Sequence, residues 1–173
     1  TKSQVKHFTR SEEERFRKAV EQGSNPRDIL IFDLLFDTGL RLSELTGLNV
    51  EDVSGKNYLT VVGKGRKERT IPIGSIKGLK KEIQTFLEWK QSHGESIHPR
   101  SPLFCSRPNR IRKNQRLSNR AIQFLVNRYS RDAGLERHFH PHACRHTFGF
   151  KLGSRGVPIQ VIKKLMGHSR IET

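Results

Sequence analysis

The chain has 173 residues, a length that allows one ordinary domain with a hydrophobic core. Its 33 lysines and arginines outnumber its 17 aspartates and glutamates, which gives a formal net charge of +16. This excess is far greater than solubility requires and predicts a polyanionic partner, with nucleic acid as the first candidate. No apolar run approaches the ~20 residues of a transmembrane helix, so no membrane role is expected. Two cysteines are too few for a disulfide framework and favour a cytoplasmic location.

The first 48 residues show the spacing of three helices. Thr9 offers a hydroxyl cap before a run of glutamates, which predicts a first helix. The run 29–36 is apolar nearly all round and predicts a helix through the middle of the core. The leucines of 42–48 are spaced by three, which predicts a short third helix with Arg41 and Glu44 on a different face.

Between Asn49 and Gly74 the apolar period changes to that of strands. The runs 58–62 and 69–73 predict an antiparallel hairpin, and the glycine-rich segment 63–68 is its turn. The run 50–53 is a candidate third strand. We therefore expect a small, three-stranded antiparallel sheet.

The rest of the chain returns to helical spacing. Helices are predicted over 76–89, around the apolar positions of 122–129, over 141–152 and over 157–166. Residues 103–105 are expected to form a brief buried edge. The predicted fold class is α+β, mainly α-helical with the small sheet.

Six basic residues and no acidic one lie between positions 107 and 120. Such a run is predicted to follow a DNA phosphate backbone, and the alternative is a solvated loop. The residues concerned are Arg107, Arg110, Arg112, Lys113, Arg116 and Arg120.

The stretch 140–149 holds three imidazoles and a guanidinium. Pro141 suits a helix start, and His142 and Arg145 then lie three apart on one helical face. A fork-shaped cation beside a group that titrates near neutral pH suits a phosphodiester substrate. The alternative is a helix whose polar face is basic without any chemistry.

Metal binding is a further alternative for the histidine-rich stretch. His138, His140, Cys144 and His146 surround His142, but their spacing scatters the side chains and no carboxylate lies among them. The chain also has few clustered carboxylates, which argues against a metal-dependent nuclease. We therefore predict neither a metal site nor another cofactor.

Four stretches, in this order along the chain, resemble the catalytic domain of the tyrosine recombinases, the phage-integrase family. They are 38–45 with Arg41, 62–69 with Lys64, 141–148 with His142 and Arg145, and 165–169 with His168. The resemblance covers nearly the whole chain. It implies the recombinase catalytic fold and site-specific recombination or integration of double-stranded DNA through a 3′-phosphotyrosine intermediate.

The resemblance also implies a role for each matching residue. Arg41 and Arg145 would hold the phosphate, and Lys64 would protonate the departing 5′-oxygen. His142 would serve the nucleophile as general acid and base, and His168 would donate a hydrogen bond to the phosphate. Cations on the non-bridging oxygens and an acid for the leaving group are what a pentacoordinate phosphorus transition state requires.

Three further residues near these positions are given supporting roles. Glu44 is expected to orient the catalytic set from behind, and Arg66 and Lys67 on the hairpin are expected to contact DNA. Cys144 falls between the two catalytic positions of its helix and is expected to be a buried packing residue.

One element of the family pattern is not found. A nucleophilic tyrosine follows the last histidine in the family, and none follows His168 here. Tyr58 and Tyr129 are both expected to be packing residues. We therefore expect 1–173 to be an integrase-type catalytic domain that is truncated before its nucleophile and lacks the family's N-terminal DNA-binding domain. The parent would form a tetramer on synapsed DNA at the nucleoid, and this chain alone would be monomeric. A non-catalytic DNA-binding module is the contrasting interpretation.

Overall fold

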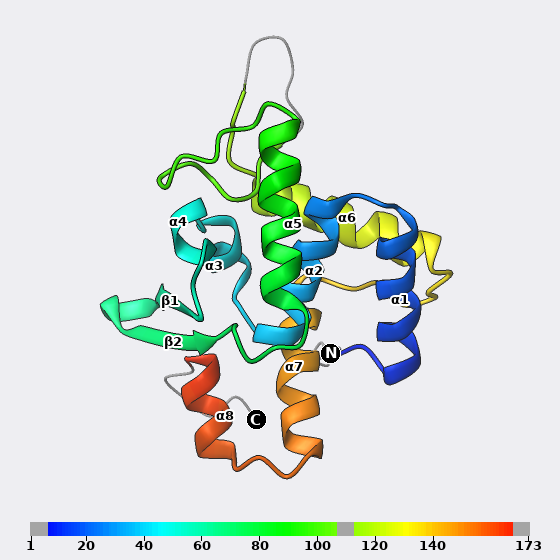
Figure 1. Cartoon of the computed structure of the whole chain (residues 1–173). Helices are drawn as coiled ribbons and strands as arrows, with labels where there is room; N and C mark the ends of the chain where they lie inside the picture. The colour runs from blue at the N-terminus through cyan, green and yellow to red at the C-terminus, as the bar shows by residue number, and fades with distance from the viewer. Residues whose placement is uncertain (1–6, 107–112, 168–173) are drawn as a thin grey trace.

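The computed structural model describes residues 7–106 and 113–167, and helices make up most of them (Figure 1). The helices are α1 Arg10–Gln22, α2 Pro26–Thr38, α3 Leu42–Thr46, α4 Val50–Val53, α5 Leu79–Ser92, α6 Asn119–Asp132, α7 His142–Ser154 and α8 Ile159–Met166. The strands are β1 Tyr58–Val62 and β2 Glu68–Pro72, with a 3-10 turn over Lys64–Arg66 between them. No described helix is both long and apolar enough to cross a membrane.

Helix α2 forms the middle of the core, as its sequence predicts. Its side chains are apolar nearly all round and are buried from Leu30 to Phe36, apart from Asp33. It contacts α1, α3, α5 and α7. The helix begins where the Asn25 side chain accepts hydrogen bonds from the Arg27 and Asp28 amides. The predicted cap of α1 is confirmed as well, because Thr9 and Glu12 form a capping box.

The sheet has two strands in the described part of the chain, so the prediction of three is wrong. β1 and β2 pair antiparallel from Tyr58 opposite Pro72 to Val62 opposite Glu68. The run expected to be a third strand is helix α4, because Asp52 accepts a hydrogen bond from the Asn49 amide at 2.7 Å and caps a helical turn. Val50 and Val53, three residues apart, are both buried, as one face of a helix requires.

The segment 103–105 is buried, as expected, and forms no regular strand. Cys105 makes an isolated bridge with Arg116, and Pro102 makes another with Asn49. Helix α5 begins at Leu79, three residues later than its spacing predicts, after Gly78 in a left-handed conformation.

The last two helices, α7 and α8, pack against elements from the first half of the chain. α7 packs against α2, and α8 contacts both α7 and β2 (Figure 1). The end of α8 therefore lies beside the hairpin and the start of α3, although these segments are about a hundred residues apart in sequence. This meeting point contains the candidate site.

Candidate functional site

Arg145 is a buried cation on α7. Only 5% of the residue is exposed. One guanidinium nitrogen, Nη1, donates to the Gly39 carbonyl, and Nη2 donates to the Met166 carbonyl at 2.5 Å. Carbonyl oxygens are neutral acceptors, so these two bonds fix the plane of the guanidinium without adding a negative charge to it.

Two glycines shape the main chain around the arginines. Gly39 ends α2 and Gly167 ends α8, with φ of +69° and +67°. A Cβ at Gly39 would overlap the Phe148 ring, and one at Gly167 would lie 2.9 Å from Arg69 Cδ. Only glycine therefore fits at these two helix ends, where the carbonyls of both residues accept hydrogen bonds from arginines.

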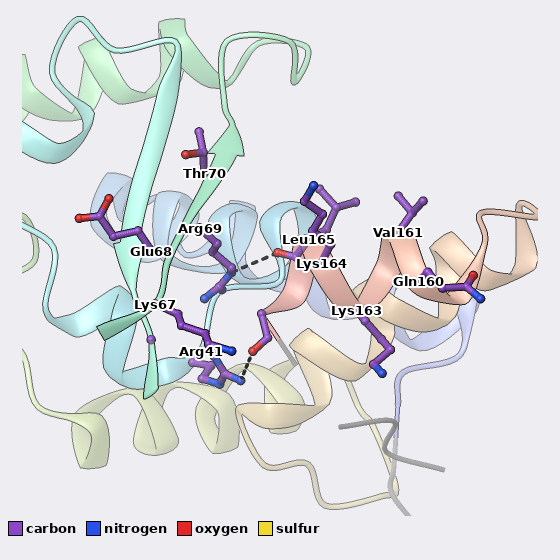
Figure 2. Close-up of a pocket in the computed structure, with 12 residues that line it drawn as sticks. Arg41, Lys67, Glu68, Arg69, Thr70, Gln160, Val161, Lys163, Lys164 and Leu165 are labelled. Atoms are coloured by element: carbon purple, nitrogen blue, oxygen red, sulfur yellow. Dashed lines mark hydrogen bonds between the residues drawn. The ribbon is translucent and has the colours of Figure 1, made fainter. Parts of the chain in front are cut away.

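Arg41 lies immediately before α3 and shares the same helix end with Arg145. Its Nη2 donates to the Gly167 carbonyl at 3.1 Å (Figure 2), one residue after the Met166 carbonyl that Arg145 binds. About 32% of the Arg41 side chain is exposed. The structure thus brings the two predicted phosphate-binding arginines together, one buried and one at the surface.

Glu44 and Arg69 form a nearly buried pair behind Arg41. The Glu44 carboxylate accepts hydrogen bonds from both terminal nitrogens of Arg69, with 2.7 Å between Nη2 and Oε1. It also accepts a hydrogen bond from the Arg41 main-chain amide at 2.8 Å. Burial raises the pKa of Glu44, but the hydrogen bonds from Arg69 and from the Arg41 amide outweigh it and lower the pKa overall. Glu44 therefore lies behind Arg41 as an ionised group, and its supporting role stays a prediction.

Sequence reasoning missed Arg69 as a site residue. It lies within the 62–69 stretch but is separated by 25 residues from Glu44, and its Nε donates to the Leu165 carbonyl at 3.1 Å (Figure 2). Its neighbours in the strand, Glu68 and Thr70, are both polar and do not indicate that the charge of Arg69 points inward. The alternating side chains of β2 in principle allowed it, because Arg69 and Ile71 point to the same face.

A hollow of about 890 Å³ opens beside this arrangement, between the hairpin and α8 (Figure 2). Its lining is basic, with Glu68 as its one acid among the described residues. The basic side chains that border it are Arg41, Lys67, Arg69, Lys163 and Lys164. Lys163 and Lys164 were not predicted as site residues. The signal that could have identified them is that two lysines stand side by side shortly before Gly167.

His142 borders a second, smaller hollow of about 450 Å³. Its exposed ring stacks on His140 with 4.8 Å between the ring centroids. Arg120 and the first residues of α3, Leu42 and Ser43, line the same hollow. The start of α3 therefore borders both hollows: Arg41 lines the larger one, and Leu42 and Ser43 line the smaller one.

The remaining predicted residues fall into three groups. Arg66, Lys67, Lys113 and Arg120 are exposed. Lys64 begins the 3-10 turn between the two strands, and its side chain is not described. The others lie outside the described residues: Arg107, Arg110, Arg112 and His168.

Arg116 does not fit the DNA-binding role predicted for it. Its Nη1 donates to the Thr46 and Leu48 carbonyls, both at 2.9 Å, and its Nη2 donates to Asn49 Oδ1 at 2.5 Å. The guanidinium thus joins the end of α3 to the loop before α6, because the carbonyls at a helix end need donors. We assign Arg116 a structural role.

The two tyrosines differ in a way that the sequence did not predict. Tyr129 is 1% exposed and donates its hydroxyl to Asp28, so its packing role is confirmed. Burial, together with this carboxylate, raises the pKa of Tyr129. Tyr58 is 62% exposed, and the prediction that it packs is wrong. Burial alternates along β1, and Tyr58 falls on the solvent side.

The cysteines and histidines of the described segments do not gather into a metal site. Within those segments, no three side chains of the His, Cys, Asp and Glu types are placed to hold a metal ion. Cys144 is fully buried, as predicted, and burial raises the pKa of its thiol.

Two arginines thus donate to main-chain carbonyls at the end of α8, and one of them, Arg41, borders a hollow lined with basic side chains. Comparison with known proteins places this domain. The chain belongs to the phage integrase family, whose family model matches residues 6–173.

Curated relatives are identical to this chain at about a third of the aligned positions. It is 37% identical over 163 residues to the tyrosine recombinase XerA of Pyrococcus horikoshii, a match that covers 93% of this chain and 53% of that protein. It is 32% identical over 151 residues to the tyrosine recombinase XerC of Actinobacillus pleuropneumoniae, covering 87% and 46%. The chain thus spans about half the length of the curated relatives it matches.

Solved structures share the fold. A crystal structure of XerA recombinase aligns with a TM-score of 0.78 and 26% identity, over 95% of this chain and 56% of that one. The XerH site-specific recombinase bound to its difH substrate aligns with a TM-score of 0.79 and 21% identity, over 98% and 50%. The predicted tyrosine-recombinase catalytic fold is therefore confirmed.

Proposed function

We propose that residues 1–173 are the catalytic domain of a site-specific DNA recombinase, which cleaves and rejoins double-stranded DNA through a 3′-phosphotyrosine. The observation that carries the proposal is the pairing of Arg41 and Arg145 at the Met166–Gly167 helix end. Family membership supports it, as does the net charge of +16. The location that follows is with DNA, in the cytoplasm at the nucleoid.

In this reaction the two arginines hold the non-bridging oxygens of the phosphate that is cut. Each guanidinium presents donors in a plane, and two such groups match the extra negative charge of the pentacoordinate transition state. Arg145 is held in place by carbonyls, so it needs little reorganisation when the charge develops. Arg41 is the more exposed of the two and meets the incoming DNA.

Proton transfers are assigned to three other side chains. Lys64, at the turn between the strands, protonates the leaving 5′-oxygen. His142, exposed beside the second hollow, exchanges a proton with the nucleophile, and His168 donates a hydrogen bond to the phosphate. The residues resemble the family pattern at each of these positions, and the proposed reaction uses neither a metal ion nor another cofactor.

The attacking hydroxyl belongs to neither Tyr58 nor Tyr129. Tyr129 is buried and bonded to Asp28, and its raised pKa opposes ionisation. Tyr58 is exposed, but it starts β1 at the end of the strand opposite the hairpin turn. We assign the nucleophile to a different tyrosine of the working assembly, a tetramer on two DNA sites.

DNA binding by this chain rests on phosphate contacts. The exposed basic residues Arg66, Lys67, Lys113 and Arg120, with Arg107, Arg110 and Arg112, are proposed to follow the backbone. Affinity should fall steeply with salt, because each phosphate contact releases a condensed counterion. A fluorescence-anisotropy titration of a duplex at several salt concentrations measures this slope. Binding that is independent of salt would rule out the proposal.

Strand cleavage is tested with the protein expressed from its complete reading frame. The protein is incubated with a pool of nicked duplexes of randomised sequence, and adducts are sought on a denaturing gel. We expect a covalent protein–DNA adduct that maps to a tyrosine other than Tyr58 and Tyr129. An adduct on either of them would overturn the assignment. Salt-dependent binding with no adduct from any pool would instead favour a DNA-binding module without chemistry.

A further inference from the structure

We infer that Arg69 is a positioning residue, which keeps Glu44 from neutralising Arg41. This inference rests on the proposed function, because it concerns how Arg41 is kept ready for a phosphate. Arg69 holds both oxygens of the Glu44 carboxylate, whereas the nearest guanidinium nitrogen of Arg41, Nη1, is 3.8 Å from it. That distance is within the range of an ion pair but too long for a hydrogen bond.

Arg41 and Arg69 compete for the Glu44 carboxylate, because both arginines lie next to it. Glu44 is three residues after Arg41, a spacing at which side chains on one helical turn meet. Its side chain is only 6% exposed, so it needs a cation. Arg69 supplies that cation through a two-bond fork, and its own side chain is 9% exposed. Arg41 is thereby left with the Gly167 carbonyl as its strongest described acceptor.

Arg69 also fixes the helix end to which both catalytic arginines bind. Its Nε donates to the Leu165 carbonyl at 3.1 Å, so carbonyls 165, 166 and 167 accept hydrogen bonds from Arg69, Arg145 and Arg41 respectively. Gly167 lies against the Arg69 side chain, with its ideal Cβ position 2.9 Å from Arg69 Cδ. One side chain therefore sets both the charge next to Arg41 and the position of its main-chain acceptor.

The test removes Arg69 and then removes the charge of Glu44. In the protein from the complete reading frame, Arg69→Met lets Glu44 bind Arg41, and we expect cleavage to fall by about 100-fold, the effect of losing one transition-state donor. DNA affinity should change much less. The double variant Arg69→Met with Glu44→Gln should recover most of the lost rate, because a neutral amide does not capture Arg41.

Two further measurements separate this role from a purely structural one. Lowering the pH protonates Glu44, so the Arg69→Met variant should gain cleavage relative to wild type as the pH falls. Lys67→Met is the matched control, since it removes a charge from the same hollow without touching Glu44. It should weaken DNA binding modestly, and Glu44→Gln should not improve it.

The outcomes are distinguishable from failure of the proposed function. If the wild type makes no adduct, the proposed function fails. If the wild type cleaves and Arg69→Met cleaves as fast, the inference fails. Failure of Glu44→Gln to rescue also overturns it, as does a loss of DNA affinity equal to the loss of cleavage. Thermal melting checks whether Arg69→Met folds. If it does not, Arg69→Lys replaces it, because lysine keeps the charge but loses the two-bond fork. Arg69→Lys is then combined with Glu44→Gln in the same way.

Discussion

Two inward-facing arginines, Arg17 and Arg145, show how the same side chain serves different ends. Arg17 on α1 is surrounded by carboxylates: Asp33 and Asp37 lie at 2.8 Å and Glu13 at 3.0 Å. Burial lowers the pKa of Arg17, but the hydrogen bonds and charges of Asp37 and Asp33 outweigh it and raise the pKa overall. Its charge is fully compensated, and the group holds helices α1 and α2 together.

Arg145 is anchored by the carbonyls of Gly39 and Met166 instead. These two acceptors are neutral, so they orient the guanidinium without adding a negative charge to it. The two arginines thus differ in the acceptors that hold them, which are carboxylates at Arg17 and include two main-chain carbonyls at Arg145, the arginine that we propose binds phosphate.

The largest effect is expected where Arg145, the proposed phosphate-binding arginine, is replaced. Arg145→Lys keeps a charge but loses the planar fork, so cleavage by the protein from the complete reading frame should fall by about 10²–10³-fold, with DNA affinity nearly unchanged. Arg41→Lys should behave alike. Rates of adduct formation at saturating DNA measure the effect, and wild-type rates in either variant would contradict the assignment.

Replacing the structural arginine should act on stability instead. Arg17→Met leaves Asp33 and Asp37 without their cation, while Glu13 keeps Lys151, and we expect a loss of about 2 to 3 kcal/mol in the free energy of unfolding, below the ~3–5 kcal/mol of a fully buried pair. Urea denaturation measures it. Arg10→Met, which breaks an exposed ion pair on the same helix, is the control and should cost less than about 0.5 kcal/mol. Equal losses in the two variants would refute the structural role of Arg17.

A smaller, pH-dependent effect is expected at Glu82, which lies beside the Arg17 cluster. Burial and the neighbouring Asp33 raise the pKa of Glu82 to about 8. The folded protein therefore holds a proton that the unfolded chain releases, and stability falls as the pH rises from the ordinary value of 4.5 to about 8.

Glu82→Gln removes this dependence. It should raise stability at pH 8 by about 1 kcal/mol, after allowance for solvent screening of a half-exposed group, and have little effect at pH 5. Urea melts at the two pH values measure the change. Glu88→Gln makes the same chemical change on the exposed side of α5 and should show no such difference. A gain for Glu82→Gln that is equal at both pH values would show that its proton is not involved.

Much of the fold, and the choice of candidate site residues, could be predicted from short stretches of the sequence. The hydroxyl cap before α1 and the apolar run of α2 have a local cause, and the arginines, lysine and histidines stand in motifs of short spacing. The run 50–53 suits a strand as well as a helix, and the cap that decides for the helix, Asp52 on the Asn49 amide, is not distinctive in the sequence. Arg69 and Arg116 were assigned incompletely or wrongly because their partners are 25 and about 70 residues away, and only the folded chain brings them together.

We propose that Arg41 and Arg145 bind a phosphate and that Arg17 does not. NMR of the arginine side-chain N–H groups, followed during titration with a short DNA duplex at low salt, tests it on the chain itself. The signals of Arg41 and Arg145 should shift and saturate together, and those of Arg17 and Arg116 should stay in place. Unchanged Arg41 and Arg145 signals at saturating DNA, or an Arg17 signal that shifts with theirs, would contradict the account.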